Sequence, residues 1–185
     1  MFNKFFISLF VFINLTTNLY ADKKQLIISK IIGIDNMIFD FEQTTNNKKE
    51  VGKCSLVFDN KLNCNYQDAK QKEIIINGEK LVVKHKRYDK IYFYPISNSP
   101  FIKIFNKTNL LNLIKESDYN LRKNIELIYV DQNKQKIIIE FEKNNYDLLG
   151  WRVVDQLQNK IEFSININEI NSKINSKIFI IPSVN

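Results

Sequence analysis

The sequence has few of the residues that enzymes use for catalysis. Its 185 residues include one histidine, His85, two cysteines and four glycines. A metal site needs several nitrogen or sulfur ligands, and one histidine does not supply them. The glycines lie far apart and form no phosphate-binding loop, and neither G-x-S-x-G nor H-E-x-x-H occurs. We therefore predict that the chain is not an enzyme and uses no cofactor or metal, with His85 at a solvated strand end.

Long apolar runs are also scarce. Phe5–Leu15 is apolar but shorter than the roughly 20 residues that a membrane-spanning helix needs. It follows Lys4 and precedes a polar stretch that ends near the small residue Ala21, a pattern typical of a secretory signal peptide. We expect residues 1–21 to be removed and residues 22–185 to form one domain; an uncleaved anchor is the alternative. No cysteine lies at the cleavage position, so we expect no lipid-anchored product.

Acidic residues are outnumbered by basic ones. There are 27 Lys and Arg against 20 Asp and Glu, a net charge of +7, although part of this reflects a composition rich in Lys, Asn and Ile. An exported basic protein meets anionic membrane surfaces or acidic partners rather than nucleic acid. Tyr92 and Tyr94 near Lys90 resemble a stacking platform for single-stranded nucleic acid, but their alternation favours a core or a cavity lining. We predict no nucleic-acid partner.

The two cysteines, Cys54 and Cys64, flank the turn signal Asp59-Asn60. If 52–58 and 62–67 form a hairpin, the two cysteines lie on adjacent strands at similar distances from the turn. In an exported chain this arrangement predicts a disulfide that adds about 2–3 kcal/mol of stability. Two free buried thiols are the alternative.

The helical signals are few. Residues 26–43 carry a stripe with spacings of three and four, which predicts a long amphipathic helix weakened by Gly33. The stripe consists of Ile27, Ile31, Ile34, Ile38 and Phe41. Residues 108–115 predict a second, short helix with Thr108 or Asn109 as its N-cap.

Strand signals fill most of the remainder. Asn77-Gly78 is a strong hairpin turn, and other short polar turns recur every 8–14 residues or so. We expect strands at 52–58, 62–67, 73–77, 79–84, 90–94, 124–131, 136–142, 150–155, 160–168 and 177–181. A single sheet of this size must curl or cover its apolar face. The predicted fold is therefore mainly β: one antiparallel sheet curved into an unclosed barrel, with the helices across its concave face.

Four segments in this order resemble the LolA family of periplasmic carriers of outer-membrane lipoproteins. They are "MIFDFEQT" (37–44), "EVGKCSLVF" (50–58), "IIINGEKLVV" (74–83), and "GWRVVDQLQNKIEFSI" (150–165) with "IFIIP" (178–182). The resemblance runs from about residue 24 to the end. It implies an unclosed β-barrel with a helical lid over a hydrophobic cavity. It also implies a monomeric periplasmic protein that takes acylated lipoproteins from an inner-membrane ABC transporter complex and passes them to an outer-membrane receptor.

The resemblance and the strand alternation together suggest which side chains contact acyl chains. We expect the cavity to be lined by Leu56, Phe58, Leu62, Tyr92, Tyr94, Trp151, Val153, Ile161, Phe163 and Ile165. We expect the lid to contain Ile31, Ile38, Phe41, Leu110, Leu111 and Ile114. For each of these side chains a solid core is the alternative, because a shift of one residue in register would reverse the face.

The first hairpin departs from the family pattern. Family members often carry there an Arg-Pro pair whose arginine is linked to lid closure, whereas this chain has Phe58-Asp59-Asn60-Lys61. Lys61 is the nearest cation, and lysine lacks the guanidinium fork. Two functions other than transport stay open: a lipid- or lipopeptide-binding sensor, and a structural envelope protein with a filled core.

Overall fold

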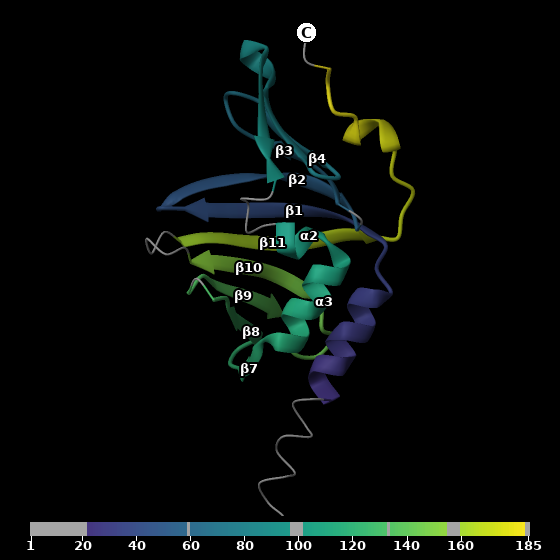
Figure 1. Cartoon of the computed structure of the whole chain (residues 1–185), viewed down its shortest axis with the longest axis vertical. Coiled ribbons are helices and arrows are strands. Elements are labelled where there is room, and N and C mark those ends of the chain that lie inside the picture. Colours follow the sequence, from purple (N-terminus) through teal and green to yellow (C-terminus); the bar gives the residue numbers. More distant parts are fainter. Residues whose placement is uncertain (1–21, 59, 97–101, 133, 155–159, 184–185) are drawn as a thin grey trace, which may run out of the picture.

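The computed structural model describes residues 22–58, 60–96, 102–132, 134–154 and 160–183. The predicted signal peptide, residues 1–21, and Asp59 of the predicted first turn lie outside them. The described residues form one antiparallel sheet of eleven strands (Figure 1). The strands are β1 Asn36–Thr45, β2 Lys48–Val57, β3 Lys61–Tyr66, β4 Lys72–Asn77, β5 Lys80–His85, β6 Lys90–Pro95, β7 Asp118–Leu121, β8 Ile125–Val130, β9 Lys136–Phe141, β10 Leu148–Val154 and β11 Lys160–Ile170.

The strand order is β6-β5-β4-β3-β2-β1-β11-β10-β9-β8-β7. Each half of the chain is thus a meander of neighbouring strands, and the halves join where β1 pairs with β11. The edge strands β6 and β7 do not pair with each other, so the sheet is not closed. This confirms the predicted fold class.

The long helix predicted for 26–43 is wrong in its second half. A helix covers 22–32, and Gly33 ends it by donating to the carbonyl of Lys30 at 3.1 Å. From Asn36 the chain is β1, in which Met37 and Phe39 are buried on one face. The sequence there satisfies both a period of two and a period of three to four, and pairing with β2 and β11 decides for the strand. Ile38 and Phe41 therefore belong to the sheet.

The second helix is confirmed as α3, Lys107–Glu116, and it follows the short helix α2, Ile102–Phe105. Its N-cap is neither Thr108 nor Asn109: the side chain of Asn106 accepts from the backbone N–H of Asn109 at 2.9 Å. The sequence pattern also missed β7, whose four residues are too few for an alternation to be recognised.

The strand predicted at 177–181 is instead the 3-10 helix η3, Ser176–Phe179. The C-terminal segment packs on the face of β3 and β4 that points away from the helices, which we call the outer face. There Asn63 donates to the carbonyl of Ile178 at 2.9 Å, and Asn77 donates to the carbonyl of Phe179 at 3.1 Å. The side chain of Phe179 is buried. Side-chain amides thus hold this segment in place of a backbone ladder.

The N-terminal helix and α3 lie side by side across the half of the sheet formed by β7–β11 (Figure 1). We call the side of the sheet that faces them the inner face. The strand register places one inner row through Phe39, Cys54, Cys64, Ile74, Val83 and Tyr92, and the next through Met37, Leu56, Leu62, Ile76, Leu81 and Tyr94. Among the described residues, no helix has the length and apolar character needed to cross a membrane.

Candidate functional site

The predicted cavity residues lie on the inner face but differ in burial. Trp151 is directly opposite Phe163, and Val153 is opposite Ile161, so these side chains share one side of the β10–β11 pair. Seven of the ten belong to one buried core: Leu56, Phe58, Leu62, Trp151, Val153, Phe163 and Ile165. Ile161 is partly buried against that core. Tyr92 and Tyr94 are exceptions, with exposed fractions of 40% and 50%.

The predicted lid residues divide between the helices and the sheet. Ile31, Leu110 and Ile114 are buried on the helices, and Leu111 packs partly buried against the same core. Ile38 and Phe41 are on β1 and do not move with a helix. The ring of Phe41 lies 4.8 Å from that of Tyr66 and 5.3 Å from that of Phe163, measured between centroids, so it forms part of the surface that the helices cover.

The two covering helices are joined by two lysines. Lys24, near the start of the first helix, donates to the carbonyl oxygens of Lys115 and Ser117 at 2.6 and 2.7 Å, at the end of α3. Lys107, at the start of α3, donates to the carbonyl of Ile32 at 3.2 Å, at the end of the first helix. A cation at a helix C-terminus satisfies free carbonyls and favours the helix dipole. The helices are therefore antiparallel, and each caps the end of the other.

Burial lowers the pKa of Lys24, although the nearby Asp118 acts in the opposite direction. Lys107 also forms an ion pair with Asp35 at 3.2 Å. In the first hairpin, the side chain of Asn60 accepts from the side-chain amide of Asn106 at 3.1 Å, just before α3. Sequence reasoning missed all of these contacts, because their partners lie far apart in the chain.

Trp151 lies at the centre of the layer between helices and sheet. Its ring is stacked on Phe163 at 5.0 Å and 10°, and it meets the ring of Phe105 on α2 edge-on at 5.5 Å and 86°. It is 2% exposed, and its indole N–H has no hydrogen-bond partner among the described residues. A buried donor without an acceptor costs about 1–3 kcal/mol. The layer therefore contains an unused hydrogen-bond donor surrounded by aromatic rings.

Two glycines allow the strands to pack under these rings. A Cβ atom at Gly52 would lie 2.2 Å from the carbonyl oxygen of Asn65 and 2.8 Å from the ring of Phe41. A Cβ atom at Gly150, which has a φ of +153°, would lie 2.0 Å from the carbonyl oxygen of Phe163. No other residue fits these positions without displacement of the backbone.

Buried side chains fill the apolar layer itself. Phe39, Leu127, Ile139 and Phe141 are at most 1% exposed beneath the helices. An acyl chain would enter this layer only if the helices moved away from the sheet. Among the described residues, no group of three or more His, Cys, Asp or Glu side chains is arranged to hold a metal ion.

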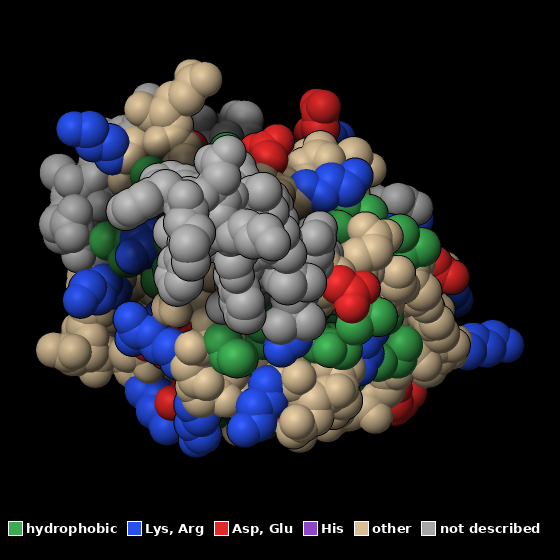
Figure 2. Space-filling model, turned by 90° about the horizontal axis from the view of Figure 1, so that it is seen from below, with side chains coloured by type: hydrophobic (Ala, Val, Ile, Leu, Met, Phe, Trp, Pro, Cys, Tyr) green, Lys and Arg blue, Asp and Glu red, His purple; other side chains and the backbone are tan. Residues whose placement is uncertain are grey.

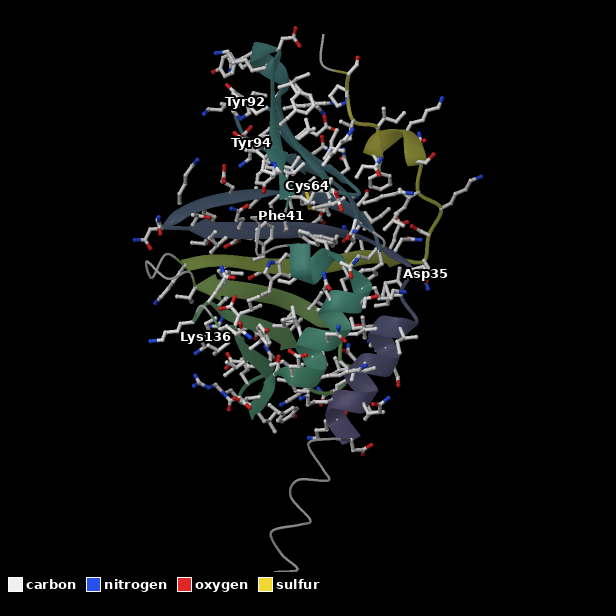
Figure 3. All side chains as sticks on the ribbon, in the orientation of Figure 1. Asp35, Phe41, Cys64, Tyr92, Tyr94 and Lys136 are labelled. Carbon is white, nitrogen blue, oxygen red and sulfur yellow. A yellow bond between two sulfur atoms is a disulfide. The ribbon has the colours of Figure 1, made fainter. Side chains whose placement is uncertain are left out.

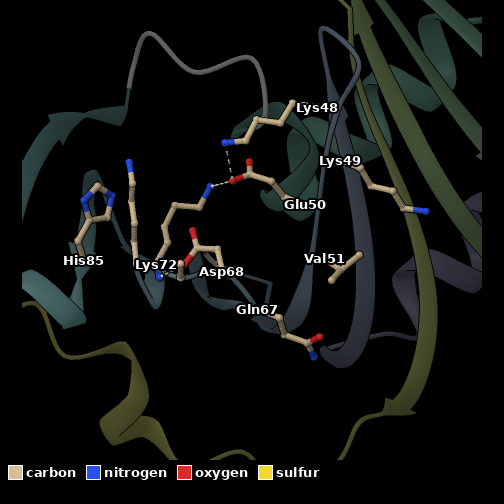
Figure 4. A pocket seen from close by; sticks show the side chains of 10 residues that line it. Lys48, Lys49, Glu50, Val51, Gln67, Asp68, Lys72 and His85 are labelled. Carbon is tan, nitrogen blue, oxygen red and sulfur yellow. Dashed lines mark hydrogen bonds and ion pairs between the residues drawn. The ribbon is translucent and has the colours of Figure 1, made fainter.

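A polar hollow of about 700 Å³ lies beyond the apolar layer, at the start of β2 and the β3–β4 turn (Figure 4). It is lined by Lys48, Lys49, Glu50, Val51, Gln67, Asp68, Ala69, Lys70, Lys72 and His85. Glu50 accepts from Lys72 at 2.9 Å and from Lys48 at 3.4 Å. The Nζ atom of Lys72 also lies over the ring of Tyr66, and burial, with the nearby carboxylates Glu50 and Asp68, raises the pKa of the Tyr66 hydroxyl.

The face of the molecule seen from below carries charges of both signs (Figure 2). Figure 2 shows Lys and Arg side chains along much of the rim of this face, with Asp, Glu and hydrophobic side chains between them.

On the outer face, Glu73 is opposite Lys84 and forms an ion pair with Lys86 at 3.2 Å. Burial raises the pKa of Glu73. The hydrogen bond from Asn63 and the two lysines lower this pKa by more than burial raises it, so the net shift is downward.

The disulfide predicted from the sequence is present between Cys54 and Cys64, which are directly opposite on β2 and β3. This inner-face position, between two apolar rows, is continuous with the core.

The sequence profile of the family described as "Outer membrane lipoprotein carrier protein LolA" matches residues 33–182. The chain belongs to the LolA family.

Solved structures give this LolA-family chain the same fold. An uncharacterized conserved protein from Thermus thermophilus superposes with a TM-score of 0.51 at 7% identity, over 88% of this chain and 94% of that one. A DUF1329 family protein from Desulfovibrio piger gives a TM-score of 0.50 at 8% identity, over 84% and 95%. A LolA superfamily protein from Nitrosomonas europaea gives 0.42 at 11% identity, over 84% and 96%, a likeness too low to carry weight. A search of the curated proteins found no match.

Proposed function

We propose that this LolA-family chain is a periplasmic carrier, not an enzyme, that binds the acyl chains of lipoproteins between its helices and the inner face. In this proposal residues 1–21 are the signal peptide. The monomeric carrier takes its cargo from an inner-membrane ABC complex and gives it to an outer-membrane receptor. Family membership over residues 33–182 supports the lipoprotein as cargo.

The environment of Trp151 is the observation that carries the proposal. An acyl chain ends, by definition, in a carbonyl group, which is a hydrogen-bond acceptor attached to an apolar tail. The unused indole N–H offers a donor to that carbonyl, and the rings of Phe105 and Phe163 offer apolar contacts to the tail. In a permanently filled core, the same N–H would remain an uncompensated cost.

The energetics explain why a lid is needed. Each acyl CH₂ moved into water costs about 0.8 kcal/mol, so a chain of about fifteen costs on the order of 12 kcal/mol. A lipoprotein therefore needs shielding to cross an aqueous space. Release must also be possible, and the lysine caps suit this, because a hydrogen bond from a charged group contributes a net stabilisation of only about 1.5–3 kcal/mol.

The test is to express the chain in a Gram-negative periplasm, purify it, and search for acylated lipoprotein by mass spectrometry. Transfer to acceptor outer membranes is then followed in the same preparation. Bound cargo that moves to the membranes supports the carrier. Cargo that binds and does not transfer contradicts transport and favours a lipid-binding sensor. A protein that binds neither cargo nor an apolar fluorescent probe would be a filled structural protein.

A further inference from the structure

The inner face of β4–β6 extends beyond the helices. We call the inner-facing side chains of this part, Ile74, Leu81, Val83, Tyr92 and Tyr94, the open inner face. Ile74 and Leu81 pack against the main core, whereas Tyr92 and Tyr94 are 40% and 50% exposed. Figure 3 shows these two tyrosines well away from the helix-covered half of the sheet. Two adjacent half-exposed tyrosines on the same face as buried apolar side chains leave apolar contact area that is available to a ligand.

The open inner face ends in a row formed by two lysines and a histidine. The next residues in the same register are Lys72, His85 and Lys90, which lie opposite one another. The ring of His85 lies 5.6 Å from that of Tyr92, and His85 also lines the hollow of Figure 4. The apolar patch and the polar hollow are therefore adjacent parts of one surface.

The hollow carries an excess of positive charge. Four lysines line it against the two carboxylates Glu50 and Asp68, and one of the four, Lys49, forms an ion pair with Glu42 outside the hollow. Glu50 forms ion pairs with both Lys48 and Lys72. Asp68 accepts a hydrogen bond from the backbone N–H of Lys72 at 2.9 Å. Lys70 has no carboxylate partner within the part of the chain that is described. The Nζ atom of Lys72 is held 3.6 Å above the ring of Tyr66, so one cation is fixed in position.

We propose that this surface binds one anionic lipid molecule, with an acyl chain along Tyr92 and Tyr94 and a phosphate headgroup among Lys48, Lys70 and Lys72. The order of the rows, apolar and then cationic, matches the order of parts in such a lipid. A zwitterionic headgroup fits less well, because its cationic end would face lysines. The site lies on strands that the helices do not cover, so this proposal does not rest on the carrier function.

The experiment measures binding of dihexanoyl phosphatidylglycerol by calorimetry, below its micellar concentration. Dihexanoyl phosphatidylcholine has the same chains and a zwitterionic head, and inorganic phosphate has no chain. We expect phosphatidylglycerol to bind about tenfold more tightly than phosphatidylcholine, as a charge-assisted contact provides. Equal binding of the two lipids would overturn the proposal. Phosphate alone binding as tightly as phosphatidylglycerol would also overturn it, by showing a plain anion site.

Paired variants separate the headgroup from the chain. The double variant K48E/K70E should abolish the tenfold preference while leaving phosphatidylcholine binding in place. K123E/K143E changes the net charge equally on exposed turns elsewhere and should keep the preference. A preference that survives in K48E/K70E would contradict the headgroup assignment.

The chain position is tested on neighbouring residues of β6. Tyr94→Ser should weaken both lipids by a similar factor, because it removes inner-face contact. Phe93→Ser is the matched control, since Phe93 is 43% exposed but lies on the outer face opposite Val82. Equal losses in the two variants would refute the assigned face. Binding to phosphatidylglycerol vesicles without binding to the monomeric lipid would also refute the site, by showing membrane docking instead.

Discussion

Replacement of Trp151 by phenylalanine tests the role assigned to its indole N–H. Phenylalanine keeps an aromatic ring against Phe105 and Phe163 but has no donor. The substitution loses some apolar contact and removes an unsatisfied donor worth about 1–3 kcal/mol. The free energy of unfolding of the empty protein should therefore change by no more than about 1 kcal/mol. Truncation of a buried tryptophan to alanine would cost about 3–5 kcal/mol.

Ligand binding should respond differently from stability. Methyl dodecanoate and dodecyl methyl ether have the same apolar chain, but only the ester has a carbonyl. We expect the wild-type protein to prefer the ester by about five- to tenfold, equivalent to one hydrogen bond of about 1 kcal/mol or slightly more. Trp151→Phe should bind both ligands with similar affinity. Displacement of an apolar fluorescent probe measures both proteins in the same way.

A control variant distinguishes the hydrogen bond from packing. Phe105→Leu removes the edge-on ring contact but leaves the indole N–H in place. It should weaken ester and ether by the same factor and keep the preference. An ester preference that is unchanged in Trp151→Phe would refute the proposed donor, and with it the observation on which the carrier function rests.

Three further predictions concern stability. Reduction of the Cys54–Cys64 disulfide, which closes a sequence separation of 10, should lower the free energy of urea unfolding by about 2–3 kcal/mol; no change would mean that the bridge does not constrain the unfolded chain. Gly52→Ala should lower the free energy of unfolding by more than about 3 kcal/mol, because its Cβ meets a carbonyl oxygen. Gly78→Ala, in an open turn, should lower it by about 1 kcal/mol. Thermal unfolding compares the two variants, and equal losses of stability would contradict the steric argument. The folded pKa of Glu73 is lowered, so its stabilisation is present above the ordinary value of 4.5 and is lost as the pH falls through the folded value. Urea unfolding between about pH 6 and about pH 3 should therefore show a shallower acid decline for Glu73→Gln than for wild type; parallel curves would remove Glu73 as the cause.

Strand signals with short turns were sufficient to predict most of the sheet. Asn77-Gly78 defined the β4–β5 hairpin, and the alternation around Trp151 and Phe163 placed both on one face, as the register confirms. These predictions succeeded because antiparallel neighbours that are joined by tight turns depend on local sequence. The Cys54–Cys64 pair was predictable for the same reason.

Segments with two compatible periodicities were not predictable in this way. Residues 36–45 fit a helix or a strand, and pairing on both sides with β2 and β11 makes them a strand. Residues 176–179 have strand-like composition, yet amides of Asn63 and Asn77 hold them as a turn of 3-10 helix over the sheet. In both cases the deciding partner is remote in the chain or supplied by the sheet.

The sequence by itself determined that this protein is one antiparallel sheet with few catalytic residue types and with alternating apolar residues along its strands. Only the tertiary structure decided which of those residues the helices cover. Lys24 reaches α3 across 91 residues to Lys115, and the ring of Phe105 closes over Trp151 from a different element. Local periodicity determines which face of a strand is apolar. What covers that face depends on contacts between distant segments, and these form only when the chain is folded.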